Sequence, residues 1–166
     1  MLGTVRIYLP TTVAGLAALH STGRLGPAPL QAHAVTPALR RSWPEADDEE
    51  LEYAVLMAAA YDSLTLIAAT SGQPRRVVVV ADADDAVVSS TASAEDPTTV
   101  SVAVDVPISR CTAVQVDDAD AEGEIVLALG RLDAAVAGDE RALADVSLVE
   151  LELMWFATQE IPDLLR

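Results

Sequence analysis

The chain has 166 residues, a formal net charge of −16 and 51 % hydrophobic residues, which is enough for one domain with a proper core. All ten basic residues are arginines, and the absence of lysine excludes P-loop and Schiff-base chemistry. The negative charge argues against nucleic acid or an anionic membrane as a partner, and it would attract a cationic protein surface. Solubility alone also explains the charge, and we favour that explanation. Because the single cysteine cannot form an internal disulfide and residues 1–10 show no signal peptide, we expect a cytoplasmic protein.

Hydrophobic periodicity and turn residues predict nine main elements in the order β-α-β-α-β-β-β-α-α. In chain order they are a strand over 5–9 ended by Pro10, a helix to about residue 22, a strand over 30–36, a helix over 44–70, strands over 75–83, 100–107 and 111–118, and helices over 119–137 and 149–160. A short helical turn over 37–42 lies between the second strand and the long helix. This order favours an α/β or α+β fold in a single domain over 1–166, with a mixed β-sheet and helices packed on it.

Two predicted helices begin at a capping box, in which a serine is followed three residues later by glutamate. Ser42 and Glu45 have this spacing before the longest helix, and Ser147 and Glu150 have it before the last one. The first two turns of the longest helix are rich in acidic residues, which the positive end of the helix dipole favours. We therefore expect much of the acid in this chain to begin helices.

Two strands end in clusters of aspartate, VVVVADADDA over 77–86 and CTAVQVDDADAE over 111–122. If both strands point the same way, Asp82, Asp84, Asp117 and Asp118 converge on one Mg²⁺ ion. An apolar strand followed by DxDD resembles the first motif of haloacid-dehalogenase-type phosphatases, which implies phosphate chemistry. Here the motif lies mid-chain without a lysine or a later GDxxxD. We favour the alternative that these aspartates begin turns and cap helices.

The turn after the first strand is a candidate anion site. In YLPTTVAG a helix begins directly at the end of a strand, where free N–H groups and the hydroxyls of Thr11 and Thr12 can bind an anion. Arg40 and Arg41 follow the second strand and can supply the positive charge. An ordinary threonine cap explains the same residues, and we favour it.

Three further residues invite a chemical interpretation. His20 lies on the stripe of the first helix, His33 lies within a strand, and either can be paired with Cys111 as a catalytic or metal site. No spacing motif supports such a pair. We therefore expect both histidines to be hydrogen-bonded structural residues.

The last segment, LELMWFATQEIPDLLR over 151–166, carries three large apolar residues in a row. On a helix, Met154, Trp155 and Phe156 cannot all face one way, so at least one points away from the main stripe. We expect core packing for most of them. The alternative is that Trp155 and Phe156 anchor a protein partner or a second copy of the chain.

Four segments carry a family resemblance: YLPTTVAGLAALH, HAVTPALRR, EELEYAVLMAAA and MWFATQEIPDLL. At these segments the chain resembles a family of small uncharacterised proteins from high-GC Gram-positive bacteria. The similarity runs almost end to end and is weakest over 85–99. The resemblance implies a bacterial cytoplasmic protein with a domain of unknown function, and it transfers no catalytic residue.

These observations together favour an acidic, non-enzymatic interaction or regulatory protein that binds a protein partner or itself. The expectation rests on the charge and on missing catalytic motifs such as GxSxG and HExxH. One alternative is a Mg²⁺-dependent phosphate-handling enzyme that uses the aspartate cluster, and the other is a small-anion binder at a helix N-terminus. No cofactor is expected outside the magnesium alternative, and neither nucleic acid nor a membrane is expected as a partner.

Overall fold

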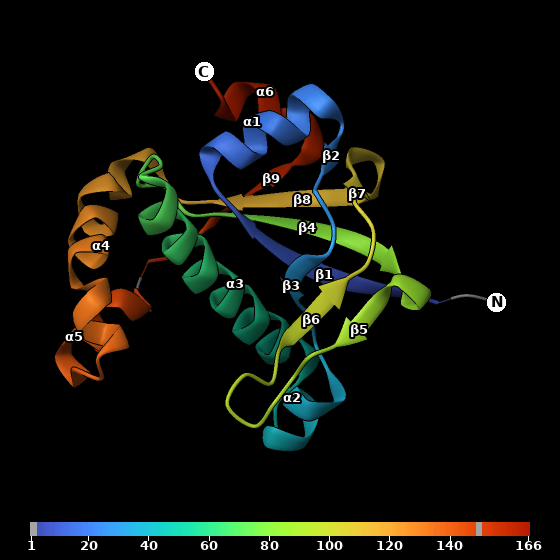
Figure 1. Cartoon of the computed structure of the whole chain (residues 1–166), viewed down its shortest axis with the longest axis horizontal. Coiled ribbons are helices and arrows are strands. Elements are labelled where there is room, and N and C mark those ends of the chain that lie inside the picture. The colour runs from blue at the N-terminus through green and yellow to red at the C-terminus, as the bar shows by residue number, and fades with distance from the viewer. Residues whose placement is uncertain (1–2, 149–150) are drawn as a thin grey trace.

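The computed structural model describes residues 3–148 and 151–166, and within them seven strands form one antiparallel sheet (Figure 1). The strand order across the sheet is β5-β6-β3-β1-β4-β8-β9. The strands are β1 (Thr4–Thr11), β3 (Leu30–His33), β4 (Val77–Asp84), β5 (Val88–Ser90), β6 (Thr99–Val102), β8 (Cys111–Val116) and β9 (Met154–Ala157). Two short strands, β2 (Arg24–Leu25) and β7 (Val106–Pro107), pair separately. The α+β alternative is confirmed in a single domain, and the strand pairs are antiparallel where the sequence had indicated a mixed sheet.

Helices cover both faces of the sheet because its central strands are apolar on both sides. The helices are α1 (Val13–Thr22), α2 (Pro37–Ser42), α3 (Asp48–Thr70), α4 (Glu122–Val136), α5 (Glu140–Ser147) and α6 (Ile161–Leu164). Along β4, Val77 and Val79 join a cluster with residues of α1 and α6, whereas Val78 and Val80 join a cluster with residues of α2 and α3. This alternation is the period of two residues that a strand imposes, so the four valines serve two cores.

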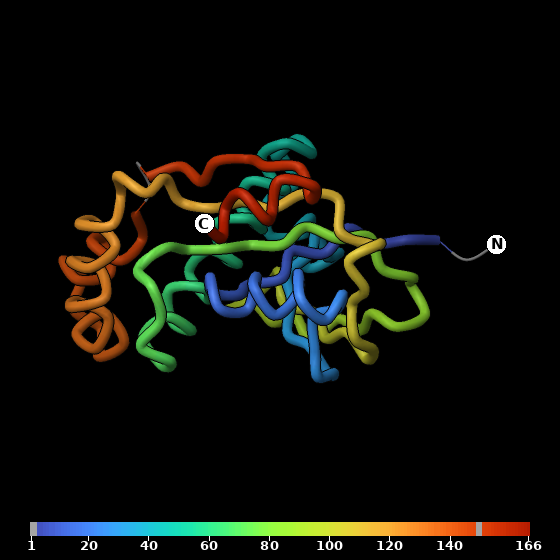
Figure 2. The backbone as a smooth tube through the Cα atoms, turned by 90° about the horizontal axis from the view of Figure 1, so that it is seen from above, coloured from blue at the N-terminus to red at the C-terminus, as the bar shows by residue number. Residues whose placement is uncertain are grey.

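A third apolar cluster joins α4 and α5 to the C-terminal half of α3. Leu64 of α3 packs there with Ile125 and Leu132 of α4 and with Val146 of α5. Figure 2 shows α4 and α5 gathered at one end of the molecule, opposite the N-terminal end. They form a lobe beside the sheet, and we call the pair the α4–α5 lobe.

The long helix α3 begins later than the sequence predicted. Its capping box consists of Asp47 and Glu50, because Asp47 Oδ1 accepts the Glu50 N–H at 2.9 Å and Glu50 Oε2 accepts the Asp47 N–H at 2.8 Å. The prediction of a capping box at Ser42 and Glu45 is wrong, since the Ser42 hydroxyl donates to the carbonyl of Leu39 within α2. By length and mean hydropathy alone α3 would also pass as a membrane span, but it lies against the sheet as a core helix.

The prediction of a helix over 149–160 is wrong where the structure describes that range. Residues 154–157 form the edge strand β9, and Pro162 lies inside α6 rather than after a helix. Tertiary pairing decides this, because Phe156 lies opposite Val114 and Trp155 opposite Gln115 of β8. Ser147 is the last residue of α5, a helix that the sequence did not predict, and Glu150 lies outside the described residues.

Three smaller corrections concern strands. The first strand continues through Pro10 to Thr11. The single strand predicted over 100–107 is divided, because β6 ends at Val102 and β7 begins at Val106 in a different sheet. The strand predicted to reach residue 36 ends at His33, from which the chain leads into α2.

Candidate functional site

The four candidate metal ligands lie at opposite ends of the sheet. The strands β4 and β8 are antiparallel neighbours, so the end of β4 lies beside the beginning of β8. Asp82 and Asp84 therefore lie at one end, whereas the backbone N–H of Asp117 donates to the carbonyl of Arg76 at the other. At about 3.3 Å per residue, the six positions from 76 to 82 correspond to roughly 20 Å. Convergence required both strands to point the same way, and they do not.

Each of these aspartates has a partner of another kind. Asp82 pairs with Arg6 at 3.6 Å and Asp84 with Arg110 at 3.0 Å. Asp118 accepts the backbone N–H two residues later at 2.9 Å, which is the helix-capping role that the sequence favoured. Across residues 3–148 and 151–166, no group of three or more histidine, cysteine or acidic side chains is placed to hold a metal ion.

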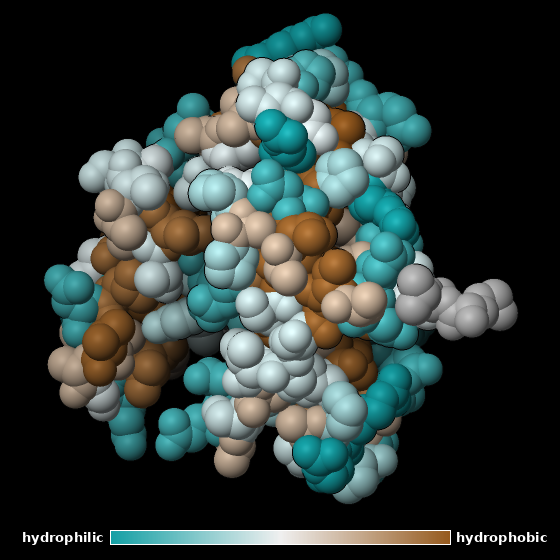
Figure 3. Space-filling model, turned by 45° about the vertical axis from the view of Figure 1, so that its right-hand side comes forward, coloured by the Kyte–Doolittle hydropathy of each residue, from teal (hydrophilic) through white to brown (hydrophobic). Residues whose placement is uncertain are grey.

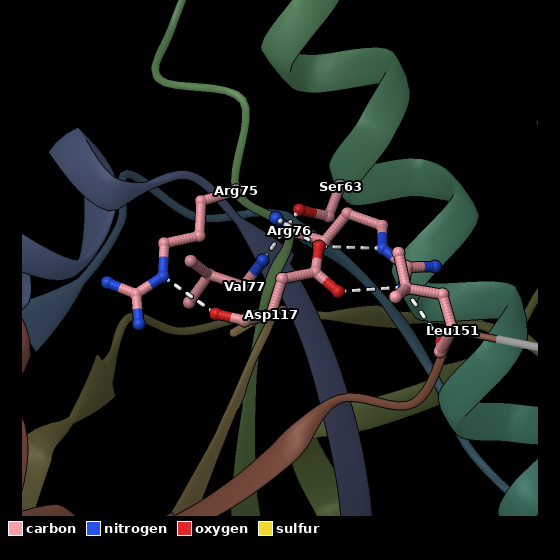
Figure 4. A network of polar contacts seen from close by, with 6 residues as sticks. All are labelled: Ser63, Arg75, Arg76, Val77, Asp117 and Leu151. Atoms are coloured by element: carbon pink, nitrogen blue, oxygen red, sulfur yellow. Dashed lines mark hydrogen bonds and ion pairs between the residues drawn. The ribbon is translucent and has the colours of Figure 1, made fainter. Parts of the chain in front are cut away.

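The fourth aspartate belongs to a buried network that the sequence analysis missed (Figure 4). Asp117 receives two hydrogen bonds from the Arg76 guanidinium, at 2.9 Å from Nε and 2.8 Å from Nη2, and a third at 2.8 Å from the Arg76 backbone N–H. Arg76 Nη2 also donates to the carbonyl of Leu151 at 3.0 Å, and Arg75 Nε donates to the carbonyl of Asp117 at 2.7 Å. The side chains of Arg76 and Asp117 are 2 % and 0 % exposed.

This network is structural rather than a binding site, because a bidentate pair with satisfied hydrogen bonds has no open position for a ligand. It ties the beginning of β4 and the end of β8 to the segment that follows α5. Beside it, the Ser63 hydroxyl donates to the carbonyl of Thr11 at 2.6 Å and accepts the Val77 N–H at 2.9 Å. α3 is thereby fixed to the same end of the sheet.

The candidate anion site is also divided. Thr12 caps α1, since its hydroxyl accepts the Gly15 N–H at 3.1 Å, and the Thr11 side chain is buried beneath that turn. A Cβ on Gly15 would lie 1.9 Å from Thr11 Oγ1, so glycine is required for this close approach. Arg40 pairs with Asp48 at 3.1 Å. Arg40 and Arg41 lie on α2, on the opposite face of the sheet from α1.

The histidines differ in environment. His33 is buried, with Nδ1 at 2.8 Å from Thr98 Oγ1 and Nε2 at 2.5 Å from Asp62 Oδ2, which is the hydrogen-bonded structural role that we expected. His20 is exposed, so the structural role expected of it is not met, and it shares a hollow of about 500 Å³ with Cys111. Burial raises the pKa of the Cys111 thiol to about 11, so the thiol is protonated at neutral pH and is not an activated nucleophile.

The two candidate partner residues face opposite sides of the edge strand β9. Phe156 packs into the cluster beneath α1 and α6. Trp155 is 60 % exposed, and its register opposite Gln115 and Val78 places it on the side of the sheet that α3 covers. Core packing was expected for most of the three apolar residues in a row, but it holds for Phe156 alone, because Met154 and Trp155 lie 43 % and 60 % exposed on an edge strand. Partner binding by Trp155 stays a prediction.

An open groove between α3 and the α4–α5 lobe combines aromatic and acidic side chains. We call it the acidic groove; its volume is about 870 Å³, and its lining residues are Trp43, Glu49, Glu50, Tyr53, Ala54, Met57 and Ser147. Trp43 and Tyr53 are 37 % and 49 % exposed, although aromatic rings of this size are usually buried. In Figure 3 a hollow separates the lobe at the left, with apolar side chains on its surface, from the rest of the molecule.

Local structure fixes the walls of the acidic groove. The capping box holds the Glu50 carboxylate at the beginning of α3, and Tyr53 and Met57 follow at helical spacing on one side of that helix. Trp43 ends α2, and Ser147 ends α5. The sequence contained the helical spacing, but the groove needs α5 as its second wall, and α5 was not predicted.

The comparisons with known proteins address the family and leave the role of the groove open. No curated protein and no solved structure matches this chain. A sequence model of a family of unknown function, DUF6912, matches residues 5–165. The resemblance to an uncharacterised family is thereby confirmed, while the bacterial group inferred with it stays a prediction. The chain belongs to the DUF6912 family of unknown function.

Proposed function

We propose that this protein is a non-enzymatic interaction protein of the cytoplasm, which binds a cationic and apolar segment of a partner protein in the acidic groove. The observation that carries the proposal is the presence of exposed Trp43 and Tyr53, with half-buried Met57, beside two carboxylates in one groove. Its volume of about 870 Å³ lies in the range of ligand sites, about 300–1,000 Å³.

The apolar side chains of the groove are of the kinds that anchor protein partners. Tryptophan and tyrosine are enriched among the residues that contribute most to binding, because each offers a large rigid surface and a polar end. Methionine adapts its shape to different partners. Trp43 and Tyr53 therefore supply anchors, and Met57 supplies an adaptable apolar surface in the same groove.

The balance of acidic and basic residues indicates the sign of the charge that a partner should carry. The chain has 26 acidic residues against ten arginines, and most of the arginines are already paired. Within the described residues, these arginines lie 2.8–3.9 Å from a carboxylate oxygen: Arg6, Arg24, Arg40, Arg76, Arg110, Arg131 and Arg166. A cationic partner is attracted by the remaining acid, whereas two copies of this chain repel each other at −16 each.

The geometry supports this function better than the two alternatives. The aspartates of the magnesium alternative lie at opposite ends of the sheet, and the threonines and arginines of the anion alternative lie on opposite faces. The acidic groove, in contrast, brings its residues together from α3, the end of α2 and the end of α5.

A pair of synthetic peptides tests the proposal. Both have about 18 residues and the same leucines, and they differ only in carrying either arginine or glutamate at the polar positions. We expect the arginine peptide to bind in calorimetry and to lose roughly tenfold in affinity between 50 and 300 mM NaCl, because salt screens exposed charges. The glutamate peptide should not bind.

Matched variants locate the binding. Tyr53→Ala should weaken binding roughly tenfold, as for a central anchor, whereas Tyr61→Ala, on the same helix but outside the groove, should not. Glu49→Lys should weaken it as well, while Glu95→Lys makes the same charge change in an exposed loop and should have little effect. Equal affinities for Tyr53→Ala, Glu49→Lys and the unchanged protein would remove the groove from the proposal.

A further inference from the structure

We infer that the segment bound in the acidic groove is a cationic amphipathic α-helix, which lies along the N-terminal half of α3 and continues the layer of the α4–α5 lobe. This inference rests on the proposed function and adds the conformation and the position of the partner segment.

One stripe of α3 is covered at one end and open at the other. Tyr53, Met57, Ala60 and Leu64 lie at spacings of four, three and four residues, so they share one side of the helix. Leu64 and Ala60 are 0 % exposed, and Leu64 packs against α4, whereas Tyr53 is 49 % exposed. A helix therefore covers the apolar stripe near Leu64, whereas among residues 3–148 and 151–166 no helix covers it near Tyr53.

The covering layer ends at the groove because α5 ends there. Ser147 lines the groove, and the next residue, Leu148, has a left-handed backbone with φ of 49°. Further along, residues 151–153 are not helical, and the carbonyl of Leu151 accepts a hydrogen bond from Arg76 Nη2. Leu151 and Leu153 pack against apolar clusters that include residues of α3, so this segment lies beside α3 on its way to β9 without extending the helical layer. The buried pair of Arg76 and Asp117 thus fixes the point where the lobe stops covering α3.

The walls favour a helix over an extended strand. Among the residues that the structure describes, they consist of side chains from α3, the end of α2 and the end of α5, and no β-strand residue lines the groove. A strand laid on such walls would leave its backbone N–H and C=O groups without partners, whereas a helix satisfies them internally. Glu49 and Glu50 at the beginning of α3 then favour arginine or lysine on the flank of the bound helix.

Two cationic peptides of identical composition test the inference. In one, leucines recur at positions i, i+3, i+4 and i+7; in the other, the same residues alternate apolar and polar as in a strand. Trp155→Phe leaves Trp43 as the single tryptophan, so its fluorescence reports on the groove. We expect the helix-patterned peptide to bind at least tenfold more tightly and to gain helical circular dichroism when it binds.

A pair of methionine variants makes the outcomes distinguishable. Met57→Ser should weaken binding of the helix-patterned peptide roughly tenfold. Met154→Ser, the same substitution at an exposed position of β9, should leave the affinity unchanged. If both peptides bind equally and Met57→Ser weakens both, the helix inference is wrong and the proposed function stands. If neither peptide binds, or Met57→Ser changes nothing, the proposed function fails and the helix inference fails with it.

Discussion

At the scale of single residues, the pair of Arg76 and Asp117 is buried and mutually satisfied, so the loss of either partner alone is costly. Asp117→Asn leaves a buried guanidinium without a counter-charge, which costs about 3–5 kcal/mol of unfolding free energy. Arg76→Met leaves the buried Asp117 carboxylate without a counter-charge in the same way. The double variant removes both charges, so we expect it to be less destabilised than the sum of the single variants by about 2 kcal/mol or more, measured by urea unfolding. Additive costs would mean that the two residues do not act as a unit.

A second prediction concerns the reactivity of the Cys111 thiol, which burial lowers by raising its pKa. Its pKa is raised from 9.0 to about 11, so at pH 8 the folded protein holds roughly one hundredth of the thiolate of an ordinary cysteine. We expect alkylation by iodoacetamide at pH 8 to be at least a hundredfold slower in the folded protein than in urea.

The same pKa shift has a consequence for stability. Below pH 9 the thiol is protonated in both states and its contribution is fully present. Between pH 9 and about 11 the unfolded chain loses this proton first, so the contribution to stability falls as pH rises.

For the alkylation experiment, rapid reaction of the folded protein at pH 8 would contradict the prediction and would indicate that His20, which shares the hollow, activates the thiol.

At the scale of elements, the sequence predicted most helices and strands where local signals and tertiary packing agree. The cap of α1 at Thr12, the proline at the beginning of α2 and the valine run of β4 are local features, and each appears as expected. β9 is different, because its residues are compatible with a helix and only pairing with β8 makes them a strand. The lobe helix α5 has a short acidic sequence whose apolar contacts, Ala142 and Val146, are too few to predict it.

The beginning of α3 provides a test of competing caps. Asp47→Ala removes the side chain that accepts the Glu50 N–H, and we expect a loss of about 1 kcal/mol in unfolding free energy. Ser42→Ala removes the residue that the sequence pattern indicated, but its hydroxyl only donates to a carbonyl within α2, so the loss should be a few tenths of that. A larger loss for Ser42→Ala than for Asp47→Ala in the same urea titration would contradict the observed cap.

At the scale of the whole molecule, the candidate sites read from sequence failed where they depended on strand direction. The aspartates were expected together only if β4 and β8 were parallel, and single residues do not carry that information. The acidic groove could not be predicted either, since Tyr53 and Met57 look like ordinary helix residues until the end of α5 is placed beside them. Net charge, in contrast, needs no fold, and it is the part of the functional proposal that the sequence alone supports.

That charge leads to opposite salt responses for folding and for binding. The unfolding free energy should rise as NaCl is increased from about 20 to 500 mM, because the screening length shrinks from roughly 20 to 4 Å and the surplus acid repels itself less. Chloride is the suitable anion, since sulfate also strengthens apolar burial and would confuse the result. Over the same range the arginine peptide should bind more weakly. A fall in unfolding free energy with NaCl would mean that the surface pairs, such as Arg110 with Asp84 at 3.0 Å, outweigh the repulsion of a net charge of −16.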